Sequence, residues 1–422
     1  MNPSAKEFVP SWSAKEFVPK VAAACAPTEV KPAESIPVPK AAEPTSVKRR
    51  ADLKPEVEEN KTAESKSPQD DLEAELAEEI DAVMAAEAAQ HDGREHVNMV
   101  FIGHVDAGKS TISGQLLIQM GMVDSRVIEK YEREAKEKNR ESWYIAYIMD
   151  VSEDERVKGK TVETGRAYFV SDKKRYTILD APGHKSYVPS MISGAAQADI
   201  AVLVISARKG EFETGFDRGG QTREHAMLVK TLGVTKLVIA VNKMDDPSVK
   251  WSEERFTGIK DKLEPFLKSC GFNTKKNVDF VPIAGLSGIN IKDKVPKEVC
   301  PWYTGASLVE LLDELPPIPR DPEGSVRIPV ADKYKAKGYT IAFGKLETGT
   351  IKVGQVVVVM PVNQEAEIAM IEINDKSVSV ATPGENLCVY LKGIEEANVL
   401  PGFVICDAVS PCPTVRSFVG KV

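Results

Sequence analysis

The chain of 422 residues has few features of a secreted, membrane-embedded or DNA-binding protein. Its six cysteines are scattered without metal-ligand spacing or a disulfide framework, which favours neutral thiols in a reducing compartment. The N-terminus lacks the charged and then apolar layout of a signal peptide, and no apolar run approaches the roughly 20 residues of a membrane span. The net charge of −8 provides no global basic field, so any contact with RNA must be local. We therefore expect a cytoplasmic protein that uses neither a membrane nor specific DNA.

Residues 1–95 also lack the apolar content that a core needs. Pro, Ala, Glu, Lys and Ser dominate, and aromatic residues are confined to the first 17 positions. Such a segment cannot bury enough apolar surface to offset its ordering entropy, so we predict a disordered tail. Apolar residues at helical spacing predict an acidic helix within it, which is either transient or docked onto the next domain or a partner. They are Leu72, Leu76, Ile80 and Val83.

A seven-residue segment occurs twice in this tail. Ser-Ala-Lys-Glu-Phe-Val-Pro fills residues 4–10 and returns at residues 13–19. The aromatic side chain of each copy has nothing intramolecular to pack against, so a pocket on another protein is its natural destination. Two copies raise the effective concentration, although a tandem duplication without function is the alternative. The predicted partner-binding residues are Phe8, Val9, Pro10, Phe17, Val18 and Pro19.

Four short motifs occur in the order that a GTPase needs, each after an apolar, strand-like run. Residues 103–110 read Gly-His-Val-Asp-Ala-Gly-Lys-Ser, which fits the phosphate-binding pattern G-x-x-x-x-G-K-[ST]. Asp-Ala-Pro-Gly follows at 180–183, Asn-Lys-Met-Asp at 242–245 and Ala-Gly-Leu at 284–286. A single motif is modest evidence, whereas all four in this order indicate that the chain binds GTP.

The pattern of apolar runs predicts two folded domains after the tail. From Val97 to about Leu315, strand-like runs alternate with helical patterns, which predicts an α/β P-loop GTPase domain over residues 96–320. We expect its sheet to be doubly wound and mostly parallel. A proline-rich linker follows, and then short β-branched runs with turn glycines predict a small β-barrel over residues 321–408. The predicted strands are Val97–Gly103, Tyr176–Leu179, Ile200–Ile205, Leu237–Val241 and Asp279–Ile283.

The first two motifs predict the phosphate and Mg²⁺ contacts. Backbone N–H groups of the loop and the start of the following helix face the phosphates, and Lys109 is a point charge for the β- and γ-phosphates. Ser110 is expected to ligate Mg²⁺, and Asp180 to hold the ion through water. Gly183 leaves room for its own N–H to approach the γ-phosphate. The predicted phosphate-binding residues are Asp106, Ala107, Gly108, Lys109, Ser110 and Thr111.

Two further residues are candidates for hydrolysis. His184, which follows Gly183, is placed to orient the attacking water, because phosphoryl transfer needs positioning more than a strong base. Thr161 lies where a mobile switch segment belongs, and its hydroxyl is the candidate for the second protein ligand of Mg²⁺. We therefore predict that His184, Lys109, Thr161 and Gly183 serve catalysis.

The last two motifs predict how guanine is distinguished from adenine. Asn242, Lys243 and Asp245 form the base-reading segment, in which the Asp245 carboxylate accepts from the ring N1–H and the exocyclic amino group. The Lys243 stem packs over the base. In the segment Ala284, Gly285 and Leu286, the Gly285 N–H is expected to donate to the guanine O6. A buried site of this kind discriminates strongly, because a wrong base leaves its polar groups unpaired.

These motifs and their neighbours resemble a known family. Residues 103–111, 180–184 and 220–226 are similar to a translational GTPase of the aminoacyl-tRNA-delivery type. Within that group, residues 131–141, 159–163 and 207–216 resemble the eukaryotic peptide-chain release-factor GTPase. The resemblance implies GTP/GDP and Mg²⁺ as cofactors, delivery of the stop-codon-reading class I release factor to the ribosome, and GTP hydrolysis there. The tail motif resembles the one by which that family binds poly(A)-binding protein.

Three departures from the family pattern accompany this resemblance. The family has a second β-barrel that supplies much of the class I factor interface, and we interpret residues 409–422 as the beginning of that barrel, with the remainder absent. Ala284 stands where the family usually has a serine, so a bracing hydroxyl is lost and nucleotide affinity is expected to fall modestly. Lys160 replaces the apolar gate of the tRNA-delivering relatives. A sister GTPase for tRNA delivery or ribosome rescue, or a truncated non-catalytic adaptor, is the alternative function.

Overall fold

The computed structural model describes the two predicted folded parts of the chain. The described residues are 93–149, 165–183, 187–217, 220–336, 338–374 and 376–417. The tail with its repeats, the switch residue Thr161 and His184 lie outside this part of the chain. Within it, no helix has the length and apolar character needed to cross a membrane.

A six-stranded sheet forms the centre of the first folded part. Its strand order is β2-β3-β1-β4-β5-β6, and all neighbours run parallel except β2 and β3. Every residue of β4 is buried, as expected for a parallel strand covered on both faces. The strands are β1 (Glu95–Gly103), β2 (Gly165–Val170), β3 (Lys174–Asp180), β4 (Ile200–Ser206), β5 (Lys236–Asn242) and β6 (Val278–Pro282).

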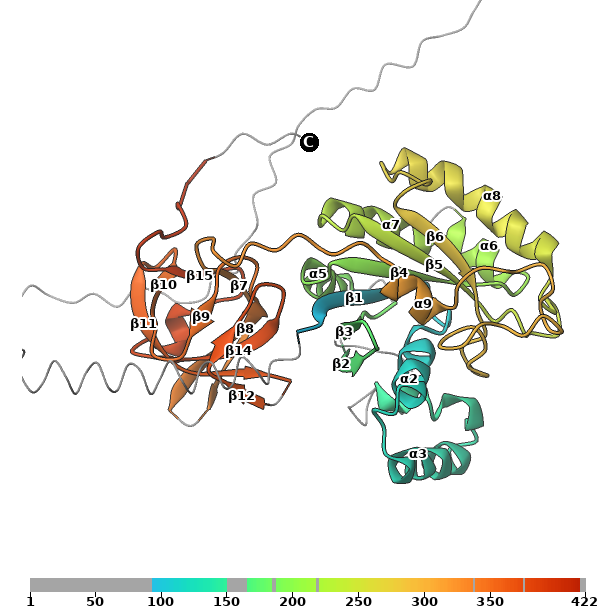
Figure 1. Cartoon of the computed structure of the whole chain (residues 1–422), viewed down its shortest axis with the longest axis horizontal. Helices are drawn as coiled ribbons and strands as arrows, with labels where there is room; N and C mark the ends of the chain where they lie inside the picture. Colours follow the sequence, from blue (N-terminus) through green and yellow to red (C-terminus); the bar gives the residue numbers. More distant parts are fainter. Residues whose placement is uncertain are drawn as a thin grey trace, which may run out of the picture. The chain divides into compact units, whose positions relative to one another are not determined.

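Helices cover both faces of this sheet, because successive strand residues point to opposite sides. In β1, Val100 and Ile102 pack in the cluster that includes α5 to α8, whereas Met99 and Phe101 pack in the cluster that includes α2 and α9. Figure 1 shows α7 and α8 on one side of the sheet and α2 on the other. The helices are α2 (Lys109–Gln119), α3 (Ser125–Glu137), α5 (Val188–Ala196), α6 (Glu211–Phe216), α7 (Gln221–Thr231), α8 (Glu253–Ser269) and α9 (Leu308–Asp313), with short 3₁₀ turns η1 (Glu141–Trp143) and η2 (Ala146–Ile148).

The second folded part is an antiparallel β-barrel. Its strands follow the order β10-β15-β7-β8-β14-β11, and the pairing of β10 with β11 closes the ring. β12 extends β11, while β9 and β13 pair separately. The bounds are β7 (Arg327–Ala336), β8 (Tyr339–Lys345), β9 (Ile351–Lys352), β10 (Val356–Met360), β11 (Gln364–Ile373), β12 (Lys376–Val378), β13 (Val380–Ala381), β14 (Asn386–Lys392) and β15 (Val404–Asp407), with η4 (Glu396–Asn398). The predicted fold class, a mostly parallel α/β domain followed by a β-barrel, is confirmed.

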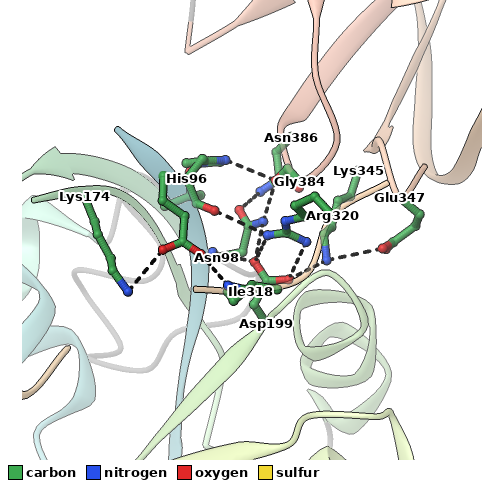
Figure 2. Close-up of polar contacts among 12 residues, drawn as sticks. His96, Asn98, Lys174, Asp199, Ile318, Arg320, Lys345, Glu347, Gly384 and Asn386 are labelled. Atoms are coloured by element: carbon green, nitrogen blue, oxygen red, sulfur yellow. Dashed lines mark hydrogen bonds and ion pairs between the residues drawn. The ribbon is translucent and has the colours of Figure 1, made fainter. Parts of the chain in front are cut away.

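Buried polar contacts join the sheet, the linker and the barrel (Figure 2). Asp199, which precedes β4, accepts hydrogen bonds from Arg320 of the linker at 2.7 and 3.0 Å, and from Lys345 of β8 at 2.9 Å. The carbonyl oxygen of Gly384 accepts from Asn98 of β1 at 2.7 Å, and Asn98 in turn accepts from Asn386 of β14 at 2.6 Å. Residues far apart in the sequence are therefore tied together by charge and hydrogen bonding.

Candidate nucleotide-binding site

The phosphate-loop motif lies between β1 and α2, as its strand–loop–helix pattern predicts. Gly108 has φ +98°, and a Cβ there would lie 2.3 Å from Asn242 Nδ2, so only glycine fits this position. Gly103 is under the same constraint, since its Cβ would lie 2.4 Å from the Val204 carbonyl oxygen. Because Gly108 has no side chain to cap α2, the helix start keeps backbone N–H groups directed at an anion site.

Lys109 lies across the phosphate loop. Its ammonium donates to the carbonyl oxygens of Gly103 and His104 at 3.2 and 3.0 Å, and the residue is 7% exposed. Gly183 packs against the same group, because a Cβ on Gly183 would lie 2.5 Å from Lys109 Nζ. The structure thus brings the second motif onto the first, and the absence of a side chain at 183 is what permits it.

The residues predicted to hold Mg²⁺ provide oxygen atoms of the kind this ion prefers. Asp180 ends β3 and is 0% exposed, so its carboxylate oxygens lie inside the fold at the carboxyl end of the strand. Ser110 adds a hydroxyl in the first turn of α2. Among the described residues no cluster of three or more His, Cys, Asp or Glu side chains forms a metal site. One carboxylate and one hydroxyl therefore fit an ion that takes its remaining ligands from phosphates and water.

Asn242 connects the phosphate loop to both segments of the guanine motif. Its side-chain amide donates to the Ala107 carbonyl oxygen at 2.9 Å. Its side-chain oxygen accepts from the N–H groups of Lys243 at 2.7 Å and Gly285 at 2.8 Å. The Gly285 N–H, which we predict to donate to guanine O6, is thus bonded to Asn242 in this structure, and contact with O6 requires that bond to be shared.

The carboxylate that we predict to read the base is exposed and has a hydroxyl partner. Asp245 Oδ2 accepts from Ser287 Oγ at 3.0 Å. Leu286 is 50% exposed beside it, and Ala284 is fully buried. The loop therefore carries a hydroxyl three residues after Ala284, and this hydroxyl bonds Asp245.

Histidine 225, on α7, supports the first glycine of the phosphate loop. Its Nδ1 accepts from the Gly103 N–H at 3.1 Å, which requires the neutral ring. Burial, followed by the charge of Lys109, lowers the pKa of His225 to about 3, so the ring is neutral at physiological pH.

A cavity of about 410 Å³ lies beside the phosphate loop. It is lined by residues of that loop, of β4 and α6 and of the segment between them, and by Thr222.

Three residues at this site were not predicted from the sequence. They are Glu211, which bonds Lys243, Ser287, which bonds Asp245, and His225, which bonds Gly103. Residues 207–216 and 220–226 served only to mark the family resemblance. For Glu211 a usable signal existed, because β4 and β5 are neighbouring parallel strands whose carboxyl ends meet at one edge of the sheet. Thr161 and His184 lie outside the described residues, so their predicted roles stay predictions.

Comparison with known proteins gives this arrangement a family. The model of the Elongation factor Tu GTP binding domain family matches residues 94–318, and that of Elongation factor Tu domain 2 matches residues 340–406. The eukaryotic peptide chain release factor GTP-binding subunit of Dictyostelium discoideum is 48% identical over 375 residues, which cover 88% of this chain and 67% of that relative. The chain belongs to this release-factor family.

Other comparisons agree with the family membership, and they show that the chain covers only part of the length of its relatives. The release factor GTP-binding subunit of Schizosaccharomyces pombe is 50% identical over 332 residues, covering 78% of this chain and 50% of that relative. The release-factor chain described here thus spans between about half and two thirds of the length of these relatives. The GTP-bound structure of the S. cerevisiae Ski7 GTPase-like domain has a TM-score of 0.64 at 20% identity and covers 77% of each chain, which indicates a shared fold.

Proposed function

We propose that this chain binds GTP with Mg²⁺, delivers the stop-codon-reading class I release factor to the ribosome and hydrolyses GTP there during translation termination. Membership in the release-factor family supports the proposal. The observation that carries it is the position of Asn242, whose side chain bonds the phosphate loop and both guanine segments at once. A site that joins phosphate and base recognition in this way suits a guanine nucleotide.

The chain's own residues divide the chemistry among them. On GTP binding, the Lys109 ammonium exchanges the Gly103 and His104 carbonyl oxygens for phosphate oxygens. Ser110, Thr161 and Asp180 would hold Mg²⁺, which neutralises charge on the phosphates when bound. His184 orients the attacking water, and the Gly183 N–H stabilises charge on the γ-phosphate. We expect slow hydrolysis by the isolated chain and acceleration when the ribosome orders the site.

The tail adds a second binding activity to the proposal. The repeated Phe-Val-Pro segments bind poly(A)-binding protein in the cytoplasm, with Phe8 and Phe17 as anchors. Replacing both phenylalanines by alanine is expected to abolish capture of poly(A)-binding protein, and Trp12→Ala, between the copies, is the matched control. Equal capture by all three chains would refute the role of the repeats.

GTP hydrolysis measured with ribosomes and class I factor, separately and together, tests the termination proposal. We expect stimulation only when both are present, and loss of stimulation in His184→Ala with GDP affinity unchanged. Stimulation by tRNA in place of the class I factor would indicate a sister GTPase. Bound GTP without any stimulation would overturn the termination proposal in favour of a non-catalytic adaptor.

A further inference from the structure

The side chain of Lys243, the lysine of the guanine motif, ends on a carboxylate from another element. Lys243 Nζ lies 2.8 Å from Glu211 Oε2, at the start of α6. Lys243 follows β5 and Glu211 follows β4, and these strands are parallel neighbours. The contact therefore joins the loop after β5 to the start of α6 at the carboxyl edge of the sheet, where α/β folds place their ligands.

Lys243 is held at both its backbone and its side chain. Its φ of +62° lies in the left-handed region, which a lysine adopts only when its surroundings hold it there. The Lys243 N–H donates to Asn242 Oδ1 at 2.7 Å, and this bond fixes the peptide. The ion pair with Glu211 fixes the far end of the side chain, which is 21% exposed. The aliphatic stem between these two anchors is thus held in one direction.

Glu211 is itself fixed in place by its own segment. Oε2 also accepts from Ser206 Oγ at 2.7 Å, and Oε1 accepts from Arg208 at 3.3 Å. Burial raises the pKa of the Glu211 carboxyl, but hydrogen bonds from Lys243 and Ser206 outweigh it, and the pKa lies below its usual value. The Glu211 carboxyl is consequently ionised at physiological pH and can pair with the Lys243 ammonium.

The same segment reaches the guanine motif at a second point. Arg208 forms an ion pair with Asp246, the residue after the base-reading Asp245. The segment is anchored from behind by Arg255 of α8, which donates to the carbonyl oxygens of Ala207 at 2.8 Å and Arg208 at 3.0 Å. Residues 206–211 thus hold Lys243 and Asp246, on either side of Asp245, against a fixed helix.

We propose that Glu211 is a positioning residue of the guanine site, which holds the Lys243 stem where the purine ring must pack. The inference rests on the proposed binding of guanine nucleotides and adds the residue that orients one of its contacts. Without Glu211, the ammonium is free to turn into solvent, and the stem must be ordered again each time a nucleotide binds.

This role predicts a distinctive pattern of base selectivity. A stem that packs on the ring face contacts guanine and hypoxanthine equally. Asp245, by contrast, reads the exocyclic amino group that hypoxanthine lacks. Loss of Glu211 should therefore weaken GDP and IDP by the same factor, whereas damage to Asp245 should weaken GDP more than IDP.

The test measures affinity and dissociation rate of GDP and IDP for the full chain carrying Glu211→Ala or Glu211→Gln. We expect Glu211→Ala to raise both dissociation constants by about tenfold, because the released Lys243 side chain must then be ordered when the nucleotide binds. Glu211→Gln keeps an acceptor for Lys243 and should have a smaller effect. Glu264→Gln is the control: it removes the same charge at the same exposed fraction of 39%, but its partner is Lys260, on α8, at 3.7 Å.

The outcomes separate this inference from the function on which it rests. If the unaltered chain fails to bind GDP, the proposed function falls. If it binds GDP but Glu211→Ala and Glu264→Gln behave alike, or if GDP and IDP change by different factors, the positioning role is wrong. Lys243→Ala alone and combined with Glu211→Ala gives a further check, since the second substitution should add little once Lys243 is gone. Equal melting temperatures for Glu211→Gln and Glu264→Gln exclude a general loss of fold.

Discussion

Single side-chain oxygens set the geometry of the guanine motif at the residue scale. Asp245 is exposed, and Ser287 Oγ, at 3.0 Å, limits how its carboxylate can turn. The position that usually provides a serine is Ala284, which is fully buried and has no hydroxyl to offer. Ser287 therefore places a hydroxyl of this loop on the carboxylate that we predict to read the base.

Removing the Ser287 hydroxyl should weaken guanine recognition. We expect Ser287→Ala to raise the dissociation constant for GDP by about fivefold, because one hydrogen bond of about 1 kcal/mol no longer orients Asp245. The effect on IDP should be smaller, since IDP lacks the amino group from which we expect Asp245 to accept a hydrogen bond. Titration with both nucleotides measures this difference, and Ser269→Ala, whose hydroxyl lies on α8 and bonds Phe266, is the control. Equal loss for both nucleotides would argue against a role through Asp245.

At the element scale, the parallel strands were predictable because most of their residues are apolar and follow one another in the sequence. β1, β4 and β5 are largely buried and mostly apolar, and each leads into a glycine-containing or polar loop. The edge strand β2 was missed. The exposed residues Arg166 and Tyr168 alternate with partly buried ones, only Phe169 of this strand is buried, and the strand lacks the apolar run that marks the central strands.

The functional role of α6 could not be predicted from local sequence. This helix has only six residues, and its Glu211 and Glu213 resemble the ordinary acidic first turn of any helix. Only the side-by-side placement of β4 and β5 directs Glu211 to Lys243 and leaves Glu213 to Arg255. The motif residues were predictable because their spacing carries the chemistry, whereas their supporting residues depend on which strands become neighbours.

Across the whole molecule, the ion pairs around Asp199 hold the barrel to the sheet. The Asp199 side chain is 5% exposed, and that of Lys345 is 6% exposed. Burial raises the pKa of Asp199, but Lys345 and Arg320 together bring it below its usual value, so the group is an anion. These contacts lie 121 and 146 positions apart in the sequence, which is why no sequence pattern reveals them.

Neutralising Asp199 should loosen this connection. Asp199→Asn leaves Arg320 without its charged partner and leaves Lys345 with only the half-exposed Glu347 at 3.4 Å, and we expect the free energy of unfolding to fall by about 3 kcal/mol. Urea denaturation measures the loss. Glu367→Gln is the control, because its ion pair with Lys392 is 46% and 64% exposed and should contribute under about 1 kcal/mol. Equal stability of the two variants would show that the buried pair is no stronger than a surface one.

The same interface predicts a dependence of stability on pH. His96 binds the Gly384 carbonyl oxygen at 3.1 Å and Thr177 Oγ1 at 2.8 Å. Burial is the main cause that lowers its pKa to about 4, helped by Arg175 and Arg320 and opposed by Asp199. The unfolded chain, with a histidine pKa near 6.5, therefore binds more protons than the folded chain between these two values. The contribution of His96 to stability is full above about pH 6.5 and is lost as the pH falls towards 4.

Comparison of the unaltered chain with His96→Gln isolates this contribution. Between pH 7 and pH 5, the free energy of unfolding of the unaltered chain should fall by about 2 kcal/mol more than that of the variant. Urea denaturation at both values measures the difference, and the other histidines cancel because both chains contain them. Parallel curves for the two chains would mean that His96 has the same proton affinity in the folded and unfolded states.

The three hydrogen bonds of Asn242 have a consequence for how pieces of a nucleotide bind. One amide group bonds the Ala107 carbonyl oxygen of the phosphate loop and the N–H groups of Lys243 and Gly285 in the guanine motif. A nucleotide fragment that orders the residues bonded to one side of the Asn242 amide also orders those bonded to the other side. Binding of the second fragment then costs no further conformational entropy. Guanosine and pyrophosphate offered together should thus bind more tightly than the product of their separate affinities. The cooperativity that we expect between the two halves of one ligand rests on a single asparagine.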